Sequence, residues 1–227
     1  KQRPEIDFYV PKEGEVAFCD LINELWKNDL DVHLTKLNEI KSVHCIIDKK
    51  AKLPAFAHRL TSLDDIPSPY TTGKLDEFFD GRLMPLLQTN RGCPFTCTFC
   101  VEGIDYYSKI RKNTTDKVVN EIEYMGLKMS QVESDVVRND LFIADSNFGM
   151  YSNDIETCKA IKKGRDKYSW PEYINVATGK NRKERVIEAA KILDGALRLS
   201  GSVQSLDKGV LDKVKRKNIS TDQLMDL

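Results

Sequence analysis

The stretch RGCPFTCTFC, residues 91 to 100, decides how this sequence is interpreted, because it places three cysteines within eight positions. Six cysteines in 227 residues are too few for a disulfide scaffold. In a reducing compartment, such a tight cluster favours metal binding or catalysis. The other cysteines stand singly beside apolar residues and are expected to be small buried hydrophobes; they are Cys19, Cys45 and Cys158.

The spacing Cx3Cx2C suits three thiolates around one compact inorganic centre. A structural zinc site normally closes with four ligands, and no second cysteine pair follows; the three histidines all lie upstream, at positions 33, 44 and 58. An iron–sulfur cube usually takes four cysteines, so three would leave one iron open to another molecule. Zinc and iron–sulfur both stay open at this point.

Composition narrows the class of protein. Lys and Arg number 35, and Asp and Glu also number 35, so the bulk charge does not indicate a nucleic-acid partner. No apolar run approaches the roughly 20 residues of a membrane helix, and the first residues carry no signal-peptide core. We predict a cytoplasmic protein with no membrane partner.

Downstream of the loop, apolar runs alternate with helical patterns. Because four strand-then-helix units in succession favour a parallel sheet with right-handed crossovers, we predict an α/β fold with a partial (β/α) TIM-type barrel at 83–227. A full barrel takes about 250 residues, so this one is expected to be truncated. The predicted strands are 83–90, 141–145, 173–178 and 196–205. The first helix is expected to be capped by Asn113 and to bury Val118, Val119, Ile122, Met125 and Met129.

Upstream, residues 1–49 are predicted to form the end of another α/β domain. Two β-rich runs, 6–10 and 42–48, flank a helix whose apolar residues recur at positions 18, 21, 22 and 25. Two strands and one helix cannot close a core alone, so we expect a remnant of a larger domain. Residues 50–82 lose periodicity and are rich in proline, which predicts an extended, solvated linker.

The cysteine loop resembles the cluster motif of radical S-adenosylmethionine (radical SAM) enzymes, CxxxCxΦC, with the aromatic Phe99 before the third cysteine. The resemblance implies that Cys93, Cys97 and Cys100 hold a [4Fe–4S] cluster whose open iron binds S-adenosylmethionine. One electron would then cleave this cosubstrate to methionine and a 5′-deoxyadenosyl radical. It implies no catalytic residue beyond the cluster ligands, and a reductant such as flavodoxin or ferredoxin.

Two further segments extend the resemblance. Asp145, Ser146 and Asn147 stand where the family's Gly-Gly-Glu segment meets the methionine amino group, and Asp145 is the preferred amine partner. Gln204 and Ser205 match the end of the family's fourth strand, near the ribose and carboxylate of the cosubstrate. The alternatives are a plain Asp-Ser-Asn turn and a helix cap at Ser205.

Residues 1–49 and the following linker resemble the end of a Rossmann-like cobalamin-binding domain, as found in one subgroup of radical SAM enzymes. This implies cobalamin as a further cofactor, and methyl transfer or a radical rearrangement on a small-molecule or peptide substrate. Two alternatives remain: a cobalamin-independent radical SAM enzyme such as a methylthiotransferase, and a non-catalytic structural metal-binding module.

Overall fold

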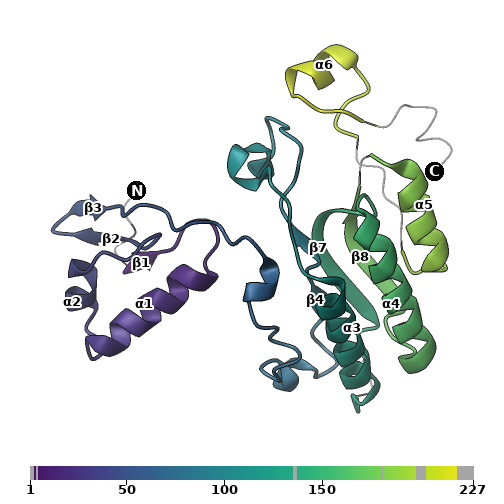
Figure 1. Ribbon diagram of the computed structural model, residues 1–227, viewed down its shortest axis with the longest axis horizontal. Helices are drawn as coiled ribbons and strands as arrows, with labels where there is room; N and C mark the ends of the chain where they lie inside the picture. Colours follow the sequence, from purple (N-terminus) through teal and green to yellow (C-terminus); the bar gives the residue numbers. More distant parts are fainter. Residues whose placement is uncertain (1–2, 4, 135–136, 180, 198–202, 219–227) are drawn as a thin grey trace. The chain divides into compact units, whose positions relative to one another are not determined.

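The computed structural model describes residues 3, 5–134, 137–179, 181–197 and 203–218. The chain divides into two compact units, Lys1–Thr61 and Ser62–Leu227 (Figure 1).

The first unit combines a small antiparallel sheet with two helices. Its strands run in the order β1 (Phe8–Tyr9), β2 (His44–Ile47) and β3 (Lys50–Lys52), and its helices are α1 (Glu15–Lys27) and α2 (Val32–Leu37). Both predicted strands and the predicted helix are confirmed. The buried apolar cluster is small, with Ala17, Leu21 and Val43 at its centre. Phe18, which was expected on the buried face of α1, is 57% exposed, because the short sheet covers only a narrow strip of the helix.

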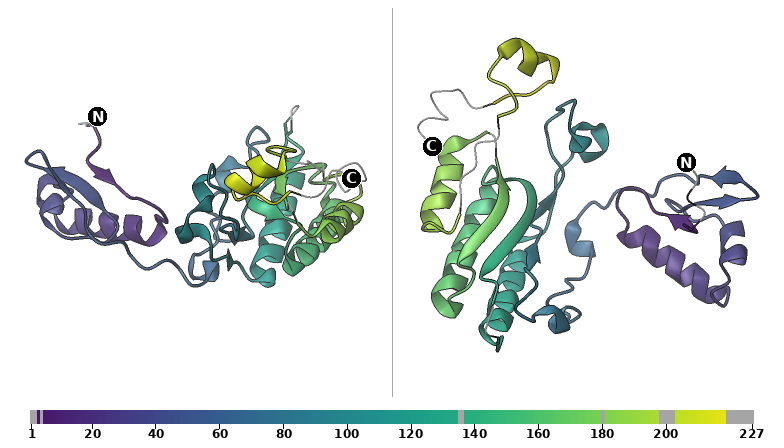
Figure 2. Two further views of the ribbon diagram at one scale, coloured as in Figure 1. Left: turned by 90° about the horizontal axis from the view of Figure 1, so that it is seen from above. Right: turned by 180° about the vertical axis from the view of Figure 1, so that it is seen from behind.

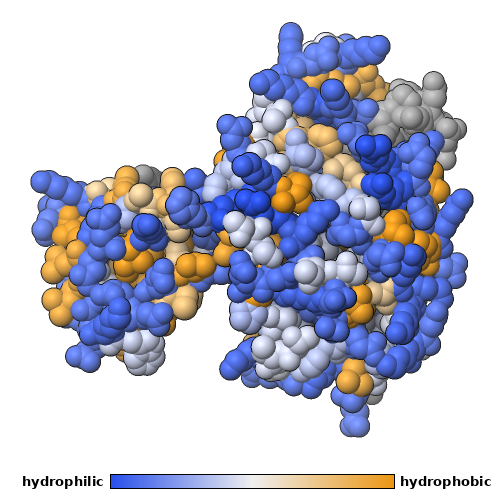
Figure 3. All heavy atoms as spheres, viewed as in Figure 1, coloured by the Kyte–Doolittle hydropathy of each residue, from blue (hydrophilic) through white to orange (hydrophobic). Residues whose placement is uncertain are grey.

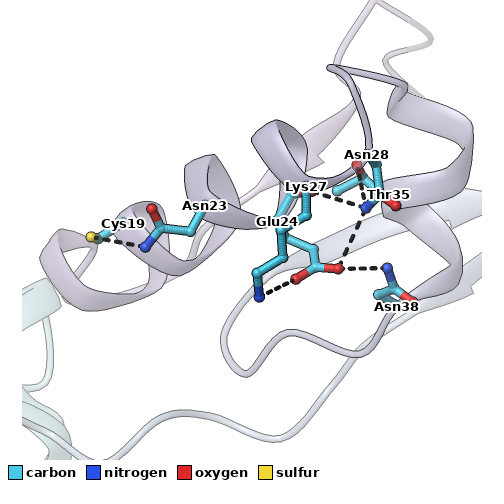
Figure 4. Close-up of polar contacts among 7 residues, drawn as sticks. All are labelled: Cys19, Asn23, Glu24, Lys27, Asn28, Thr35 and Asn38. Atoms are coloured by element: carbon cyan, nitrogen blue, oxygen red, sulfur yellow. Dashed lines mark hydrogen bonds and ion pairs between the residues drawn. The ribbon is translucent and has the colours of Figure 1, made fainter.

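Polar side chains join the end of α1 to α2 (Figure 4). Asn28 Nδ2 donates to the Glu24 carbonyl at 2.9 Å and to Thr35 Oγ1 at 3.4 Å. Asn38 Nδ2 donates to Glu24 Oε1 at 2.7 Å. Nearer the start of α1, Asn23 Nδ2 lies 3.7 Å from the Cys19 sulfur. Cys19 was predicted to be buried but is exposed. Because the apolar cluster is so small, these hydrogen bonds help to fix the two helices.

The stretch 50–82 is more ordered than a solvated linker. Its first residues form β3. Glu13 accepts hydrogen bonds from Arg59 Nε at 2.9 Å and from the Leu60 amide at 3.2 Å. Further on, Leu63 is buried, and the Tyr70 hydroxyl donates to the Leu86 carbonyl at 2.6 Å. Sequence periodicity missed these contacts because they come from single anchoring side chains rather than from a repeating face.

The second unit is built on a parallel sheet in the order β4 (Leu86–Leu87), β7 (Asp140–Phe148) and β8 (Tyr173–Thr178). The pairing aligns Leu86 with Phe142 and Leu141 with Ile174. Helices α3 (Thr115–Ser130), α4 (Ser152–Tyr168) and α5 (Lys183–Ile192) lie side by side along one face of this sheet (Figures 1 and 2). Three of the predicted strand-then-helix units are therefore confirmed.

The fourth predicted unit is described only in part. Leu197 makes a parallel bridge to Ile174, while the predicted strand continues into 198–202, outside the described residues. The helix that follows is the short α6 (Lys208–Lys213). Before α3, two short strands, β5 (Asn90–Arg91) and β6 (Arg111–Lys112), form an antiparallel pair around the cysteine loop.

Two details of α3 refine the prediction. Its N-cap is Thr114, whose hydroxyl accepts from the Lys117 amide at 3.4 Å. Asn113, predicted as the cap, instead donates its Nδ2 to the Gln88 carbonyl at 2.7 Å. Of the predicted apolar face, Val119 is 36% exposed. The remaining members are buried in the core, as predicted: Val118, Ile122, Met125 and Met129.

The core lies between the sheet and its helices. It gathers Leu87, Leu141, Ile143 and Phe148 from the strands, each with no exposed surface, and each such side chain contributes about 1.5–3 kcal/mol on burial. On the first unit, by contrast, apolar surface stays exposed (Figure 3).

No helix within the described ranges is long and apolar enough to cross a membrane.

Candidate metal centre

The end of strand β7 departs from regular pairing. Residues Asp140 to Ile143 pair in register with β8, after which the register shifts and Phe148 pairs with Thr178. Residues 144–147 therefore lie opposite a single residue of β8. Such bulges re-aim side chains that would otherwise alternate between the two faces of a sheet. The predicted site residues 145–147 lie in this bulge, and all three bind the segment that carries the cysteines.

Asp145 anchors the start of that segment. One carboxylate oxygen accepts from the Thr89 amide at 2.9 Å and the Asn90 amide at 3.2 Å. The other accepts from Asn90 Nδ2 at 2.8 Å and from the Thr89 hydroxyl. Burial raises the pKa of Asp145 to about 6, although these hydrogen bonds favour the ionised form. Asp145, which was predicted to bind an amine, thus accepts four hydrogen bonds from its own chain.

The next two residues bind closer to the cysteines. The Ser146 hydroxyl donates to Glu102 Oε1 at 2.9 Å. Asn147, which is 1% exposed, places Nδ2 3.3 Å from the Cys93 sulfur. The end of β7 is thereby joined to both sides of the cysteine loop.

The three cysteines are free thiols on one turn-rich loop. Cys93 and Cys97 are each 6% exposed, and Cys100 is partly exposed. The Cys100 amide donates to the Cys97 carbonyl at 3.1 Å, and the Gly103 amide to the Cys100 carbonyl at 3.0 Å. A Cβ on Gly103 would lie 2.2 Å from the Cys97 carbonyl oxygen, so only glycine permits this fold of the loop.

Phe99 lies on the outer side of the loop, 51% exposed. The Arg216 guanidinium lies 5.9 Å from the centre of its ring, within the range of a cation–π contact. Beside it, the Thr98 amide donates to the Val214 carbonyl at 3.1 Å. The chain that follows α6 is therefore in direct contact with the cysteine loop.

Gln204 and Ser205 precede α6. Gln204 is exposed. The Ser205 hydroxyl accepts from the Asp207 amide at 3.1 Å, and it is Asp207 that caps α6 by accepting from the Val210 amide at 2.8 Å. Asn218 Nδ2 donates to the Ser205 carbonyl at 2.9 Å. Asn218 also accepts from Arg216 Nε, so hydrogen bonds connect Ser205 to the residue that covers Phe99.

Across the described ranges, no group of three or more His, Cys, Asp or Glu side chains lies close enough to hold one metal ion. Two buried carboxamide oxygens near the loop, Asn90 Oδ1 and Asn147 Oδ1, have no hydrogen-bond partner among the described residues. Unpaired buried oxygens are costly and uncommon in folded proteins.

Comparison with known proteins shows which enzymes the chain is similar to. No family model matches it. It is 32% identical over 237 residues to the cobalamin-dependent radical SAM methyltransferase TokK of Streptomyces tokunonensis, across 100% of this chain and 33% of that protein. It is 33% identical over 235 residues to the 2-(S-pantetheinyl)-carbapenam-3-carboxylate methyltransferase of Streptantibioticus cattleyicolor, with the same two shares. The chain is a homologue of cobalamin-dependent radical SAM methyltransferases. It spans about a third of the length of these curated relatives.

Solved structures agree on the fold. The cobalamin-dependent S-adenosylmethionine radical enzyme OxsB, with aqua-cobalamin and S-adenosylmethionine bound, gives a TM-score of 0.59 at 18% identity, over 95% of this chain and 30% of OxsB. The radical S-adenosylmethionine methyltransferase TsrM of Kitasatospora setae gives 0.61 at 16% identity, over 98% of this chain and 43% of TsrM. The α/β fold is thus confirmed. The two curated relatives confirm the resemblance to cobalamin-dependent radical SAM enzymes.

Sequence reasoning missed several residues around the cysteines of this radical SAM homologue. Thr89 and Asn90 are buried polar residues close behind the apolar residues of β4, and this position was the available signal. Glu102 comes two residues after the last cysteine of the loop, Cys100. Tyr151 follows the bulge; its hydroxyl is buried, and burial together with the nearby Cys93 raises its pKa. No spacing pattern in the sequence reveals Glu102 or Tyr151 as neighbours of the loop.

Proposed function

We propose that this chain carries the core of a cobalamin-dependent radical SAM methyltransferase, in which Cys93, Cys97 and Cys100 hold a [4Fe–4S] cluster. One observation carries the proposal: three free thiols lie on a loop that is hydrogen-bonded to the end of the neighbouring parallel strand. In parallel α/β folds, functional groups collect at these strand ends. The likeness to named methyltransferases extends along the whole chain.

The residues present fit such a cluster. Cys93 and Cys97 are shielded from water yet belong to neither apolar cluster of the chain, and the loop is compact enough to require glycine at position 103. A cube takes one thiolate on each iron, so its ligands do not converge on a single point as those of one ion do. When bound and reduced, the cluster supplies the one electron that cleaves S-adenosylmethionine to methionine and a 5′-deoxyadenosyl radical.

The chain's own residues would bind and orient the cosubstrate. Phe99 belongs to the loop itself, and Ser146 and Asn147 are hydrogen-bonded to Glu102 and Cys93, which supports the assignment of all three to this site. Gln204 and Ser205 remain assigned through the hydrogen bonds that lead from Ser205 towards the loop. Asp145 would act by holding Thr89 and Asn90 in place, since its carboxylate oxygens already accept four hydrogen bonds.

The finer architecture is part of the same proposal. The parallel order β4-β7-β8 and the parallel bridge between Ile174 and Leu197 support a partial (β/α) TIM-type barrel in the second unit. The first unit would be the end of a Rossmann-like cobalamin-binding domain; its described strands pair antiparallel, as an edge of such a domain can.

Cobalamin would donate the methyl group to an unactivated carbon of a small molecule or peptide, and flavodoxin or ferredoxin would supply the electron. Free cysteine thiols that bind a cluster persist in a reducing compartment, which fits a cytoplasmic location. The names of the relatives favour methyl transfer over the other radical outcomes. Methylthiotransfer and a structural metal site are the alternatives that the test must separate.

The test is anaerobic. We would express the whole coding sequence, reconstitute the protein with iron and sulfide, reduce it, add S-adenosylmethionine and quantify 5′-deoxyadenosine together with bound iron and cobalamin. The parent protein should bind about four iron atoms per chain and form the product. Cys97→Ala should lose both, whereas Cys19→Ala, which changes an exposed cysteine remote in sequence from the loop, should retain both.

A parent protein that binds zinc in place of iron, and whose unfolding midpoint falls on chelation, would establish the structural alternative. Product formation without cobalamin, in protein produced with ample cobalamin, would indicate a cobalamin-independent enzyme.

A further inference from the structure

The amide of Asn147 directly contacts one of the three cysteines. Its Nδ2 lies 3.3 Å from the Cys93 sulfur, and both side chains are almost fully shielded from water. The backbone at Asn147 and at the next residue is fixed, because the Met150 amide donates to the Asn147 carbonyl at 3.2 Å and the Gly179 amide to the Phe148 carbonyl at 2.7 Å. The contact is therefore held by the bulge of β7.

The protonation state of a cluster ligand decides which way the amide points. A thiolate has no proton to donate, so it accepts the N–H of an amide and repels its oxygen. With Nδ2 on the sulfur, Oδ1 of Asn147 is left buried without a partner among the described residues. Such an oxygen costs stability. The asparagine leaves this oxygen unpaired, while its N–H supplies the donor that a ligand thiolate needs.

We infer that Asn147 raises the reduction potential of the cluster by donating its N–H to the Cys93 thiolate. The inference rests on the proposed function, since it requires a [4Fe–4S] cluster on this loop. Reduction adds one electron and no proton, so the negative charge on the ligand sulfurs increases. A hydrogen bond to a ligand sulfur stabilises the reduced form more than the oxidised form, and hydrogen bonds of this kind are among the factors that set cluster potentials.

The negative charge near Asn147 is the reason why such a donor is useful. Two carboxyl groups lie near Asn147. Glu102 accepts a hydrogen bond from Ser146, and Asp145 lies two positions before Asn147 in the same bulge. Negative charge near a cluster opposes its reduction. A neutral N–H donor aimed at the ligand sulfur works against this effect without adding a positive charge, which would itself attract anions to the site.

The experiment measures the cluster's midpoint potential rather than turnover. Parent, Asn147→Leu and Asn147→Ala proteins would be reconstituted anaerobically and titrated with titanium(III) citrate, which supplies one electron per ion, while the reduced cluster is followed by electron paramagnetic resonance. Asn175→Leu makes the same chemical change on the neighbouring strand β8, where the amide is exposed and binds Asp140 at 2.9 Å.

Both Asn147 variants should retain their iron, and the equilibrium constant for reduction should fall about tenfold, which is a shift of about 59 mV to lower potential for a one-electron couple. Asn175→Leu should match the parent. Asn147 variants that keep the cluster and the parent's potential would overturn the inference while leaving the proposed function intact. Loss of the cluster from both variants would also overturn it, since Asn147 would then be needed for assembly. A parent protein without a [4Fe–4S] cluster would instead refute the proposed function.

Discussion

Cys158 and the pair Cys93 and Cys97 are buried to nearly the same degree, yet their surroundings differ completely. Cys158 has no exposed surface and packs inside the main apolar cluster, where burial raises the pKa of its thiol to about 12. Cys93 and Cys97 are 6% exposed and lie outside both apolar clusters, at the polar end of the sheet. Burial alone therefore does not reveal the role of a thiol; its position relative to the strand ends does.

The largest expected effect follows from this contrast. Cys93→Ala should remove a cluster ligand, so that bound iron falls from about four atoms per chain to nearly none. Cys158→Ala should keep the iron but lower the free energy of unfolding by about 1–3 kcal/mol, because it leaves a small cavity in the core. Iron analysis after reconstitution and urea unfolding of the apoproteins would measure the two effects separately.

If Cys158→Ala lost iron as completely as Cys93→Ala, the contrast would fail, and the core cysteine would have to act in cluster assembly. Equal loss of stability in the two apoproteins, with iron retained in both, would mean that the loop cysteines serve only packing.

A second effect concerns the carboxylate that anchors the loop. Asp145→Ala would leave the buried donors of Thr89 and Asn90 without an acceptor, which should cost roughly 2–4 kcal/mol of unfolding free energy. Trp170, 3% exposed, reports on the second unit in a Trp26→Phe background, because the chain has two tryptophans. Its fluorescence in urea would give the midpoint.

Asp166→Ala serves as the matched control, since Asp166 is an exposed carboxylate on α4 that pairs with Lys162. It should leave the midpoint unchanged. An Asp145→Ala protein as stable as this control would show that water replaces the carboxylate, and the anchoring role would have to be abandoned.

Repeating patterns in the sequence predicted much of the second unit. Spacing by three and four found the buried face of α3, and apolar runs found β7 and β8. The cysteine spacing located the candidate site. These features are local, so a single segment carries each of them.

The contacts that build the site are not local. Asp145 meets Thr89, which is 56 positions away, and Asn147 meets Cys93, which is 54 positions away. Both contacts depend on the pairing of β4 with β7 and on the register shift in β7. No periodicity encodes a bulge, so sequence patterns do not reveal that the Asp145 carboxylate accepts hydrogen bonds from Thr89 and Asn90. The amine-binding role of Asp145 came from the family resemblance and stays a prediction.

The smallest expected effect is a pH dependence at Asp154, the buried carboxyl that accepts from the Gly149 amide at 2.8 Å and the Tyr151 amide at 2.9 Å. Burial raises its pKa from 3.8 to about 6. The folded protein therefore binds more protons than the unfolded chain between these values. Stability should fall as pH rises from about 4 to about 6 and then level off, with Asp154 contributing on the order of 2 kcal/mol.

Asp154→Asn would separate this contribution from the core, because the amide oxygen can still accept from both backbone amides while the group no longer titrates. The slope of unfolding free energy between pH 4 and pH 6 should become clearly smaller; Asp145 and Glu121, whose pKa values burial raises in the same direction, contribute to the remainder. Glu156→Gln, on the exposed side of the same helix, should keep the full slope. If Asp154→Asn also kept the full slope, Asp154 would have to be hydrated in solution. The start of α4 would then be accessible to water, like the polar end of the sheet, and not dry, like the core.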